Sequence, residues 1–186
     1  HLYQKHIDLH LSQAVKGFVP VSGPDPLIRV QLNDGNVLEA DMVILSIGVR
    51  PDTSLAKQAG ITLGRTGGIH VNQYLRTSAE NVYAVGDAIE FPHPVSGEPW
   101  LNYLAGPANR QARIVADNMV FGDRIAYEGS IGTSIAKVFD LTVGSTGLPG
   151  KKLKQLNIPY LTSTTHSNSH AGYYPNALQM STKITF

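Results

Sequence analysis

The sequence of 186 residues contains no cysteine. Disulfide bonds, thiolate metal sites and a cysteine nucleophile are therefore excluded within these residues. A metal ion would have to rely on the seven histidines and on carboxylates. The one helix-like spacing, between His166 and His170, falls in a stretch rich in Ser, Thr and Asn rather than on a helical pattern. We therefore expect no metal site.

Long apolar runs are missing as well. The longest stretches that are mainly apolar, residues 42–47 and 114–121, fall well short of the roughly 20 residues that a membrane-spanning helix needs. The 15 basic and 14 acidic side chains nearly balance, so the chain lacks the positive charge typical of proteins that bind nucleic acid or anionic membranes. Residues 1–10 also lack the pattern of a secretory signal. We expect a soluble, cytoplasmic protein without nucleic-acid or membrane partners.

The first fifty residues carry short alternating patterns. Apolar residues alternate with polar ones over residues 7–11 and 28–32, which predicts half-buried antiparallel strands. Turn-forming residues occupy 23–26 and 33–36, and the second group contains the Asp-Gly pair typical of a hairpin turn. Residues 42–47 are instead apolar except for Ser46 and predict a strand buried on both faces, as in a parallel sheet.

Helices and strands alternate in the middle of the chain. Residues 53–59, which a glycine follows, predict a short helix, and residues 82–85 predict another fully apolar strand. Prolines and glycine between residues 90 and 99 predict an irregular loop. A longer helix is expected over residues 107–122. Its expected apolar face consists of Ala108, Ala112, Val115 and Met119.

A new unit is expected to begin near residue 124. Residues 133–143 predict one or two strands, and residues 148–156 predict a short basic helix. Two more strands are expected at residues 160–165 and 179–186. The predicted fold class is therefore α/β for the earlier part of the chain and α+β for the last part.

Asp87 is the first candidate site residue. It follows Gly86 at the end of the apolar run 82–85, and ligands of open α/β sheets bind in the crevice beyond such strand ends. An ionised carboxylate only accepts hydrogen bonds, which suits the hydroxyl groups of a ribityl or ribose chain. From these residues alone, a cap or turn aspartate is an equally good interpretation.

The stretch from Thr77 to Asp87, TSAENVYAVGD, resembles the second flavin-binding motif of the pyridine nucleotide-disulfide oxidoreductase family. The resemblance implies that Asp87 binds the ribityl hydroxyl groups of FAD. It also implies that Gly86 lets the cofactor approach the backbone, since glycine adds no side chain there. An FAD-dependent enzyme that uses NAD(P)H is the expected parent protein.

Two further stretches resemble parts of the same family. Residues 43–52, VILSIGVRPD, resemble the exit from its NAD domain, where Gly48 would lie near the nicotinamide; a turn glycine after a core strand is the alternative. Residues 104–113, LAGPANRQAR, resemble the helix whose amino terminus points at the pyrimidine edge of the flavin. Such a helix would favour negative charge on the reduced flavin, although a purely structural helix is the alternative. The cofactor-binding residues implied here are Leu104, Ala105, Gly106 and Pro107.

The last part of the chain resembles one branch of the family more narrowly. Residues 132–140, GTSIAKVFD, and 169–175, SHAGYYP, resemble the dimerisation domain of coenzyme A-disulfide reductases, NADH-dependent persulfide reductases and related NADH oxidases. In that branch, tyrosines of one subunit reach toward the active-site cysteine of the other. Tyr173 and Tyr174 are therefore the candidate catalytic residues, through hydrogen bonds to a thiolate or thiol substrate; packing within a turn is the alternative. Asn176 stands where relatives commonly have glycine.

The resemblance implies three pieces of a larger enzyme. Residues 1–48 would be the end of a Rossmann-like NAD domain, residues 49–123 the second segment of an FAD domain, and residues 124–186 the first part of a dimerisation domain. The family's G-x-G-x-x-G fingerprints and redox cysteine are absent from the sequence. The resemblance places them before the first residue, so the chain is expected to be an inactive fragment by itself.

The expected function of the parent is reduction of a disulfide or persulfide, such as coenzyme A disulfide, by a homodimer that uses FAD and NAD(P)H. An NADH oxidase or peroxidase shares every motif above and is the enzymatic alternative. A self-associating module without activity of its own is the non-enzymatic alternative.

Overall fold

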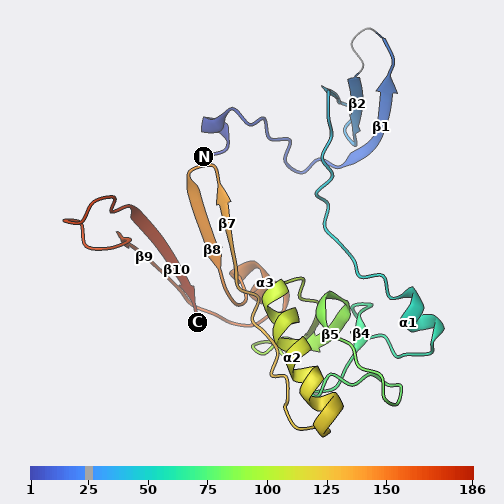
Figure 1. The fold of residues 1–186 in the computed structure, drawn as a ribbon. Helices are drawn as coiled ribbons and strands as arrows, with labels where there is room; N and C mark the ends of the chain where they lie inside the picture. The colour runs from blue at the N-terminus through green and yellow to red at the C-terminus, as the bar shows by residue number, and fades with distance from the viewer. Residues whose placement is uncertain (24–26) are drawn as a thin grey trace. The chain divides into compact units, whose positions relative to one another are not determined.

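The computed structural model describes residues 1–23 and 27–186. The chain forms two compact units, His1–Val49 and Arg50–Phe186, which are described separately (Figure 1). The turn predicted at residues 23–26 lies mostly outside the described residues.

The first unit contains a short 3-10 helix, η1 (Tyr3–Lys5), and one antiparallel sheet in the order β1-β2-β3. The Asp-Gly turn between β2 and β3 is confirmed as a hairpin, because the N–H of Leu32 donates to the carbonyl of Asn36 at 2.9 Å. Gly35 in this turn has a φ of 91°, a conformation that glycine adopts without strain. Val30 and Leu32 are buried. The strands are β1 (Val15–Val21), β2 (Leu27–Leu32) and β3 (Val37–Ala40).

Two strands predicted in this unit do not form. Residues 7–11 are irregular, and the backbone turns on either side of them, where His6 and Ser12 have positive φ angles. Residues 42–47 are also irregular, and Ile44 and Ile47 are 82% and 89% exposed. A strand of a parallel sheet exists only beside neighbours that accept and donate its hydrogen bonds. None of the described strands pairs with residues 42–47.

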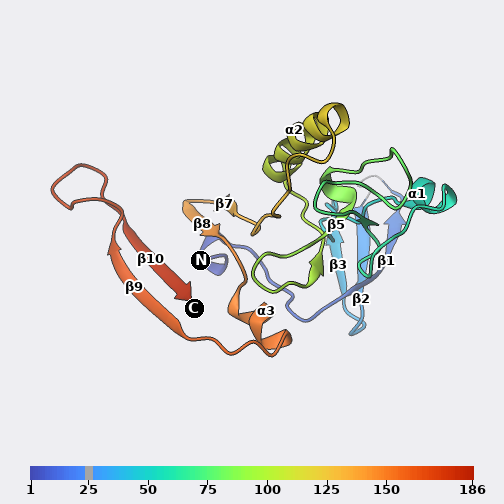
Figure 2. The ribbon, with the colours of Figure 1, turned by 90° about the horizontal axis from the view of Figure 1, so that it is seen from below.

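The second unit contains three small sheets. In the first, β4 pairs with β5 in parallel and β6 pairs with β5 antiparallel, so the order is β4-β5-β6. The strand pairs β7-β8 and β9-β10 are antiparallel hairpins (Figures 1 and 2). The elements in chain order are α1 (Ser54–Gln58), β4 (Ile69–His70), η2 (Gly86–Ala88), β5 (Ile89–Pro92), β6 (Pro99–Trp100), α2 (Ala105–Phe121), β7 (Ser134–Val138), β8 (Leu141–Ser145), α3 (Gly150–Gln155), β9 (Thr162–Asn168) and β10 (Gln179–Thr185).

Most elements expected in this unit are present. The helices α1, α2 and α3 and the strands β7 to β10 confirm the predictions made from their residues, with bounds shifted by a few positions. The irregular loop expected at residues 90–99 is wrong in part, because its two ends pair as β5 and β6. The strand expected at residues 82–85 is reduced to one bridge between Tyr83 and Arg76. Its apolar residues pack as an extended segment against the core rather than in a ladder.

The core of the unit lies between α2 and the first sheet. It consists of Val71, Leu75, Ile89, Ile114 and Tyr127. The face of α2 that was expected to be buried is correct only in part: Val115 packs against the core, but the buried residues are Gln111, Ile114 and Asn118, and Met119 is 62% exposed. The apolar pattern missed part of the buried face because two amide side chains, Gln111 and Asn118, are buried with their hydrogen bonds satisfied.

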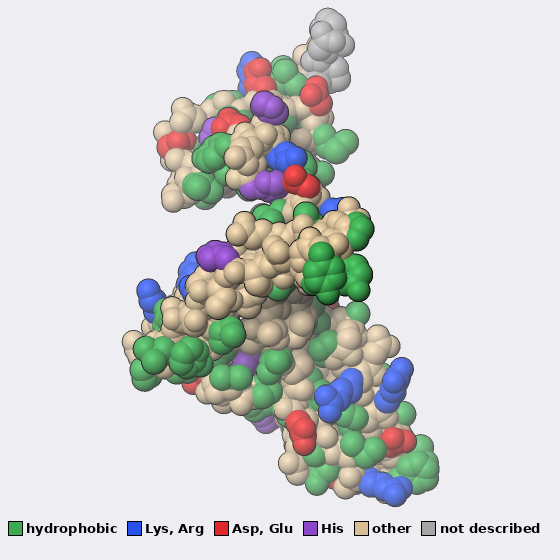
Figure 3. Space-filling model, turned by 90° about the vertical axis from the view of Figure 1, so that its left-hand side faces the viewer, with side chains coloured by type: hydrophobic (Ala, Val, Ile, Leu, Met, Phe, Trp, Pro, Cys, Tyr) green, Lys and Arg blue, Asp and Glu red, His purple; other side chains and the backbone are tan. Residues whose placement is uncertain are grey.

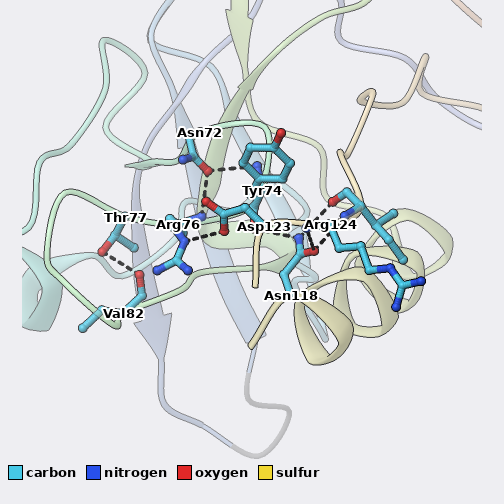
Figure 4. A network of polar contacts seen from close by, with 9 residues as sticks. Asn72, Tyr74, Arg76, Thr77, Val82, Asn118, Asp123 and Arg124 are labelled. Carbon is cyan, nitrogen blue, oxygen red and sulfur yellow. Dashed lines mark hydrogen bonds and ion pairs between the residues drawn. The ribbon is translucent and has the colours of Figure 1, made fainter. Parts of the chain in front are cut away.

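Asn118 connects three segments of the chain (Figure 4). Its Nδ2 donates to the carbonyls of Tyr74 and Ile125, at 3.2 and 2.9 Å. Its Oδ1 accepts from the N–H groups of Arg124 and Ile125, at 3.1 and 2.9 Å. The side chain is 0% exposed, so all of its polar atoms are satisfied inside the protein. This amide fixes the direction in which the chain leaves α2.

Replacing Asn118 by alanine should destabilise the second unit by about 2–4 kcal/mol, because four backbone groups lose the buried side chain that is their hydrogen-bond partner. Asn109→Ala is the matched control, since Asn109 is exposed on the same helix and donates only to the carbonyl of Ala105. Thermal and urea unfolding of both variants measures the difference. Equal stability of the two variants would contradict the role given to Asn118.

His93 makes the stability of this unit depend on pH. His93 is 2% exposed, and its Nδ1 accepts the N–H of Val95 at 3.1 Å. The centroid of its ring lies 4.6 Å from that of Trp100, in an edge-to-face arrangement. Burial lowers the pKa of His93 below its ordinary value of 6.5. The unfolded chain therefore binds a proton at a pH where the folded chain does not, and stability is lost as the pH falls below about 6.5.

We expect the thermal midpoint to fall less between about pH 7 and about pH 5 in His93→Gln than in the parent chain, because the titrating ring is gone. His70→Gln, at an exposed position in β4, should keep the parent's pH dependence. The opposite ranking of the two variants would show that another group titrates.

Candidate functional site

The segment of residues 77–87 begins with a closed loop. Both the N–H and the Oγ1 of Thr77 donate to the carbonyl of Val82, at 2.9 and 3.0 Å, as Figure 4 shows for the side chain. The Oγ1 also accepts the N–H of Ala79 at 3.2 Å, and Asn81 turns the chain with a φ of 59°. The hydrogen bonds of Thr77 thus close a loop that reverses the chain, and residues 82–85 then run along the core.

The segment ends in the one-turn helix η2, which contains two of the predicted site residues. Gly86 has a φ of 81°, which favours glycine. Its N–H donates to the Oε1 of Gln111 at 2.7 Å, and Gln111 is buried in α2. Asp87 follows with an exposed side chain. The carboxylate of Asp87 is therefore accessible to solvent, while the backbone of the turn that carries it is hydrogen-bonded to α2.

The amino terminus of α2 lies next to this turn. A methyl group added at Gly86 would lie 3.9 Å from the Cβ of Ala108, in the first turns of the helix. Leu104 is the N-cap residue, and its side chain has no acceptor for the first N–H groups. The N–H groups of Ala105 and Gly106 have no hydrogen-bond acceptor among the described residues. Free N–H groups and the helix dipole favour an anionic or acceptor group here.

A cleft of about 530 Å³ opens beside this helix end. Leu104, Gly106 and Pro107 line it, together with the basic side chain of Arg110. The opposite wall contains Pro94 and the segment of residues 128–133. The cleft is large enough for part of a cofactor-sized ligand.

The structure brings together only some of the predicted site residues. Gly86 and Asp87 lie beside the start of α2, where the predicted residues of that helix are found. Gly48 belongs to the other unit, where it is exposed with a φ of 90°. Tyr173 and Tyr174 lie between β9 and β10 and do not line the cleft.

Two polar residues that position the site were not predicted. Gln111 is one of them. The feature of the sequence that could have identified it is its spacing of three and seven residues from Ile114 and Asn118, which places all three on one face of the helix. Glu90 is the other: it is 4% exposed, and its Oε2 accepts the N–H and the Oγ1 of Thr66, both at 2.6 Å. Glu90 therefore fixes the turn before β4 against the strand that follows η2.

The described residues limit other kinds of site. Within residues 1–23 and 27–186, no three His, Asp or Glu side chains lie close enough to hold a metal ion. Over the same ranges, no helix has the length and apolarity that crossing a membrane requires.

A sequence profile of the family described as pyridine nucleotide-disulphide oxidoreductase matches residues 1–109. The chain belongs to this family. A similar curated member is the NAD(P)H sulfur oxidoreductase (CoA-dependent) of Pyrococcus furiosus, 34% identical over 177 residues, which are 95% of this chain and 39% of that protein. The chain thus spans about two fifths of the length of the curated members it matches first.

Solved structures of the family contain the same fold. The reduced CoADR-RHD of Bacillus anthracis is 51% identical with a TM-score of 0.82, over 85% of this chain and 28% of that one. The NAD-dependent persulfide reductase from A. fulgidus is 34% identical with a TM-score of 0.90, over 100% of this chain and 34% of that one. The mixed α/β architecture described above is therefore a part of the family fold.

Gly86→Ala should destabilise the second unit by about 1–2 kcal/mol, because alanine is strained at this positive φ. The nearest atom to the new methyl is 3.9 Å away, so the cost comes from the backbone and not from a clash. Gly106→Ala in α2 is the control, since nothing lies within 4 Å and the backbone is helical. Its stability should be unchanged or raised by up to about 1 kcal/mol. Urea unfolding of both variants checks the predicted difference in sign.

Proposed function

We propose that this chain supplies the second FAD-binding segment of an FAD-dependent NAD(P)H oxidoreductase that reduces a disulfide or persulfide such as coenzyme A disulfide. One observation supports this proposal above the others: the turn that carries Asp87 is hydrogen-bonded to the helix whose uncapped amino terminus borders the cleft. The substrate class is taken from the names of the relatives, which describe oxidoreductases of sulfur, persulfide and coenzyme A disulfide.

The residues present fit a bound flavin. Gly86 leaves the backbone open, and the exposed carboxylate of Asp87 would accept hydrogen bonds from ribityl hydroxyl groups. The N–H groups of Ala105 and Gly106 would favour negative charge on a bound flavin, an electrostatic contribution that needs no proton transfer. FAD and NAD(P)H supply the hydride transfer, whereas these residues bind and orient.

The boundaries of the domains are part of the proposal. Residues 1–48 would complete an NAD domain, with Gly48 near the nicotinamide, and residues 49–123 would belong to the FAD domain. Residues 124–186 would begin a dimerisation domain, with Tyr173 and Tyr174 serving the partner's site. Exposed apolar residues support contacts beyond those described, and Figure 3 shows such side chains on one face. In β7 and β8 they are Ile135, Val138, Leu141 and Val143.

A homodimer and a cytoplasmic location are also part of the proposal. A homodimer follows from the exposed strands and the resemblance of residues 132–140 and 169–175. A cytoplasmic location follows from the class of enzyme.

Oxygen reduction is the second candidate function. A member from Methanocaldococcus jannaschii that is 33% identical over 153 residues is named NADH oxidase. The residues described here serve flavin binding in either reaction, so they do not distinguish the two. Oxygen consumption and thiol release by the full-length enzyme, measured with the same NADH supply, separate them.

Replacing Asp87 by asparagine in the full-length enzyme should weaken FAD binding about 10-fold to 100-fold, because charge-assisted hydrogen bonds to the ribityl hydroxyl groups are lost. Asp117→Asn is the control, since Asp117 is an exposed carboxylate on α2. Flavin content after purification and the Kd from flavin fluorescence measure the effect. Undiminished affinity in Asp87→Asn would remove Asp87 from the site.

A further inference from the structure

The loop between β9 and β10 is closed at its base by two hydrogen bonds. The strands pair up to Asn168 and Gln179. Beyond this pair, the N–H of Ser169 donates to the carbonyl of Leu178 at 2.8 Å, and the N–H of Leu178 donates to the Oγ of Ser169 at 3.2 Å. The loop that carries the two candidate tyrosines therefore starts from a fixed backbone (Figures 1 and 2).

His170 closes the upper part of this loop. Its Nε2 lies 3.2 Å from the carbonyl oxygen of Pro175, and its Nδ1 lies 3.1 Å from the Oγ of Ser169. A carbonyl oxygen only accepts hydrogen bonds, so Nε2 must carry the proton and donate. In the neutral ring, Nδ1 then accepts the hydroxyl proton of Ser169. One side chain thus joins the two ends of the segment between Ser169 and Pro175.

The tyrosines depend on the backbone of this segment for their position. Tyr173 and Tyr174 are 85% and 60% exposed, so little packing orients them. Their rings lie 4.9 Å apart and are tilted by 37°. The N–H of Tyr174 donates to the carbonyl of Ala171 at 3.0 Å, and Asn176 turns the chain with a φ of 64°. The segment holds its shape through these backbone bonds and through His170.

We infer that His170 is a positioning residue that holds Tyr173 and Tyr174 in the geometry needed for reaction with the thiol or disulfide substrate. The inference rests on the proposed function, in which these tyrosines reach the redox centre of the partner subunit. Because two side chains with exposed rings must meet a reacting sulfur at hydrogen-bond distance, a displaced backbone would lower the rate of the thiol step. The step in which NAD(P)H reduces the flavin would be unaffected.

The test uses three variants of the full-length enzyme. In His170→Gln the amide nitrogen reaches about as far as Nε2 and still donates to Pro175. In His170→Asn the amide reaches only about as far as Nδ1, so the bond across the loop is lost. His166→Asn is the matched control, because His166 lies in β9 of the same hairpin and its Nδ1 lies 2.8 Å from the Oγ of Ser181.

We expect kcat/KM for the disulfide to fall about tenfold in His170→Asn, and by less than about threefold in His170→Gln and His166→Asn. Stopped-flow reduction of the flavin by NAD(P)H should be equal in all three variants. A merely structural loss would lower flavin content and the unfolding temperature as well, and the rescue by glutamine would be missing. Equal disulfide kinetics in His170→Asn and His170→Gln would overturn the role of His170.

Tyr173→Phe and Tyr174→Phe separate this inference from the proposed function. If one of them slows the thiol step, combining it with His170→Asn should cost less than the product of the single effects, because both changes act on one interaction. If a tyrosine variant is slow while His170→Asn is unimpaired, the positioning role of His170 is overturned, but the role of the tyrosines in the proposed function is not. Two unimpaired tyrosine variants overturn the tyrosines' part in the proposed function, and the role of His170 falls with it.

Discussion

The hydrogen bond from the N–H of Gly86 to Gln111 is the interaction on which the candidate site depends. It joins a backbone turn that only glycine adopts without strain to a residue buried in α2. A buried N–H without an acceptor is costly, so the turn and the helix are fixed together. Asn118 does the same near the other end of α2, where the chain leaves the helix. Ile114 lies between them and packs in the core, so two buried amides and one apolar side chain on the same face hold the helix in place.

Elements determined by short-range chemistry were predictable from the sequence. The hairpin at Gly35 follows from an Asp-Gly pair, and α1 ends before a glycine with a positive φ. Two of the failures share one cause: residues 42–47 and 82–85 are apolar enough for strands but need hydrogen-bonding neighbours that local sequence does not reveal. The periodicity and apolarity of a segment indicate which side chains it can bury. Whether the segment becomes a strand depends on neighbouring strands that can form hydrogen bonds with it.

The candidate site, like the fold, was predictable from the sequence only in part. Asp87 and residues 104–107 could be proposed from the sequence because their motifs are contiguous, and in the structure the turn at Gly86 lies beside the start of the helix. Gln111 was missed, because a glutamine on a helix is ordinarily exposed and only its spacing from Ile114 marks it as facing inward. The electrostatics of the helix end were predictable in kind, since they follow from backbone geometry, whereas the cleft beside it required coordinates.

The exposed run of residues 42–47 has a consequence for handling the polypeptide. It is six residues long, uncharged after Asp41, without proline, and rich in Ile, Val and Leu. Segments of this kind pair with copies of themselves into cross-β aggregates when they are solvent-accessible. Ile44 and Ile47 are mostly in contact with solvent, so concentrated solutions of the chain by itself are prone to precipitate through this run. A charged residue in its middle would act as a gatekeeper and keep the polypeptide dispersed.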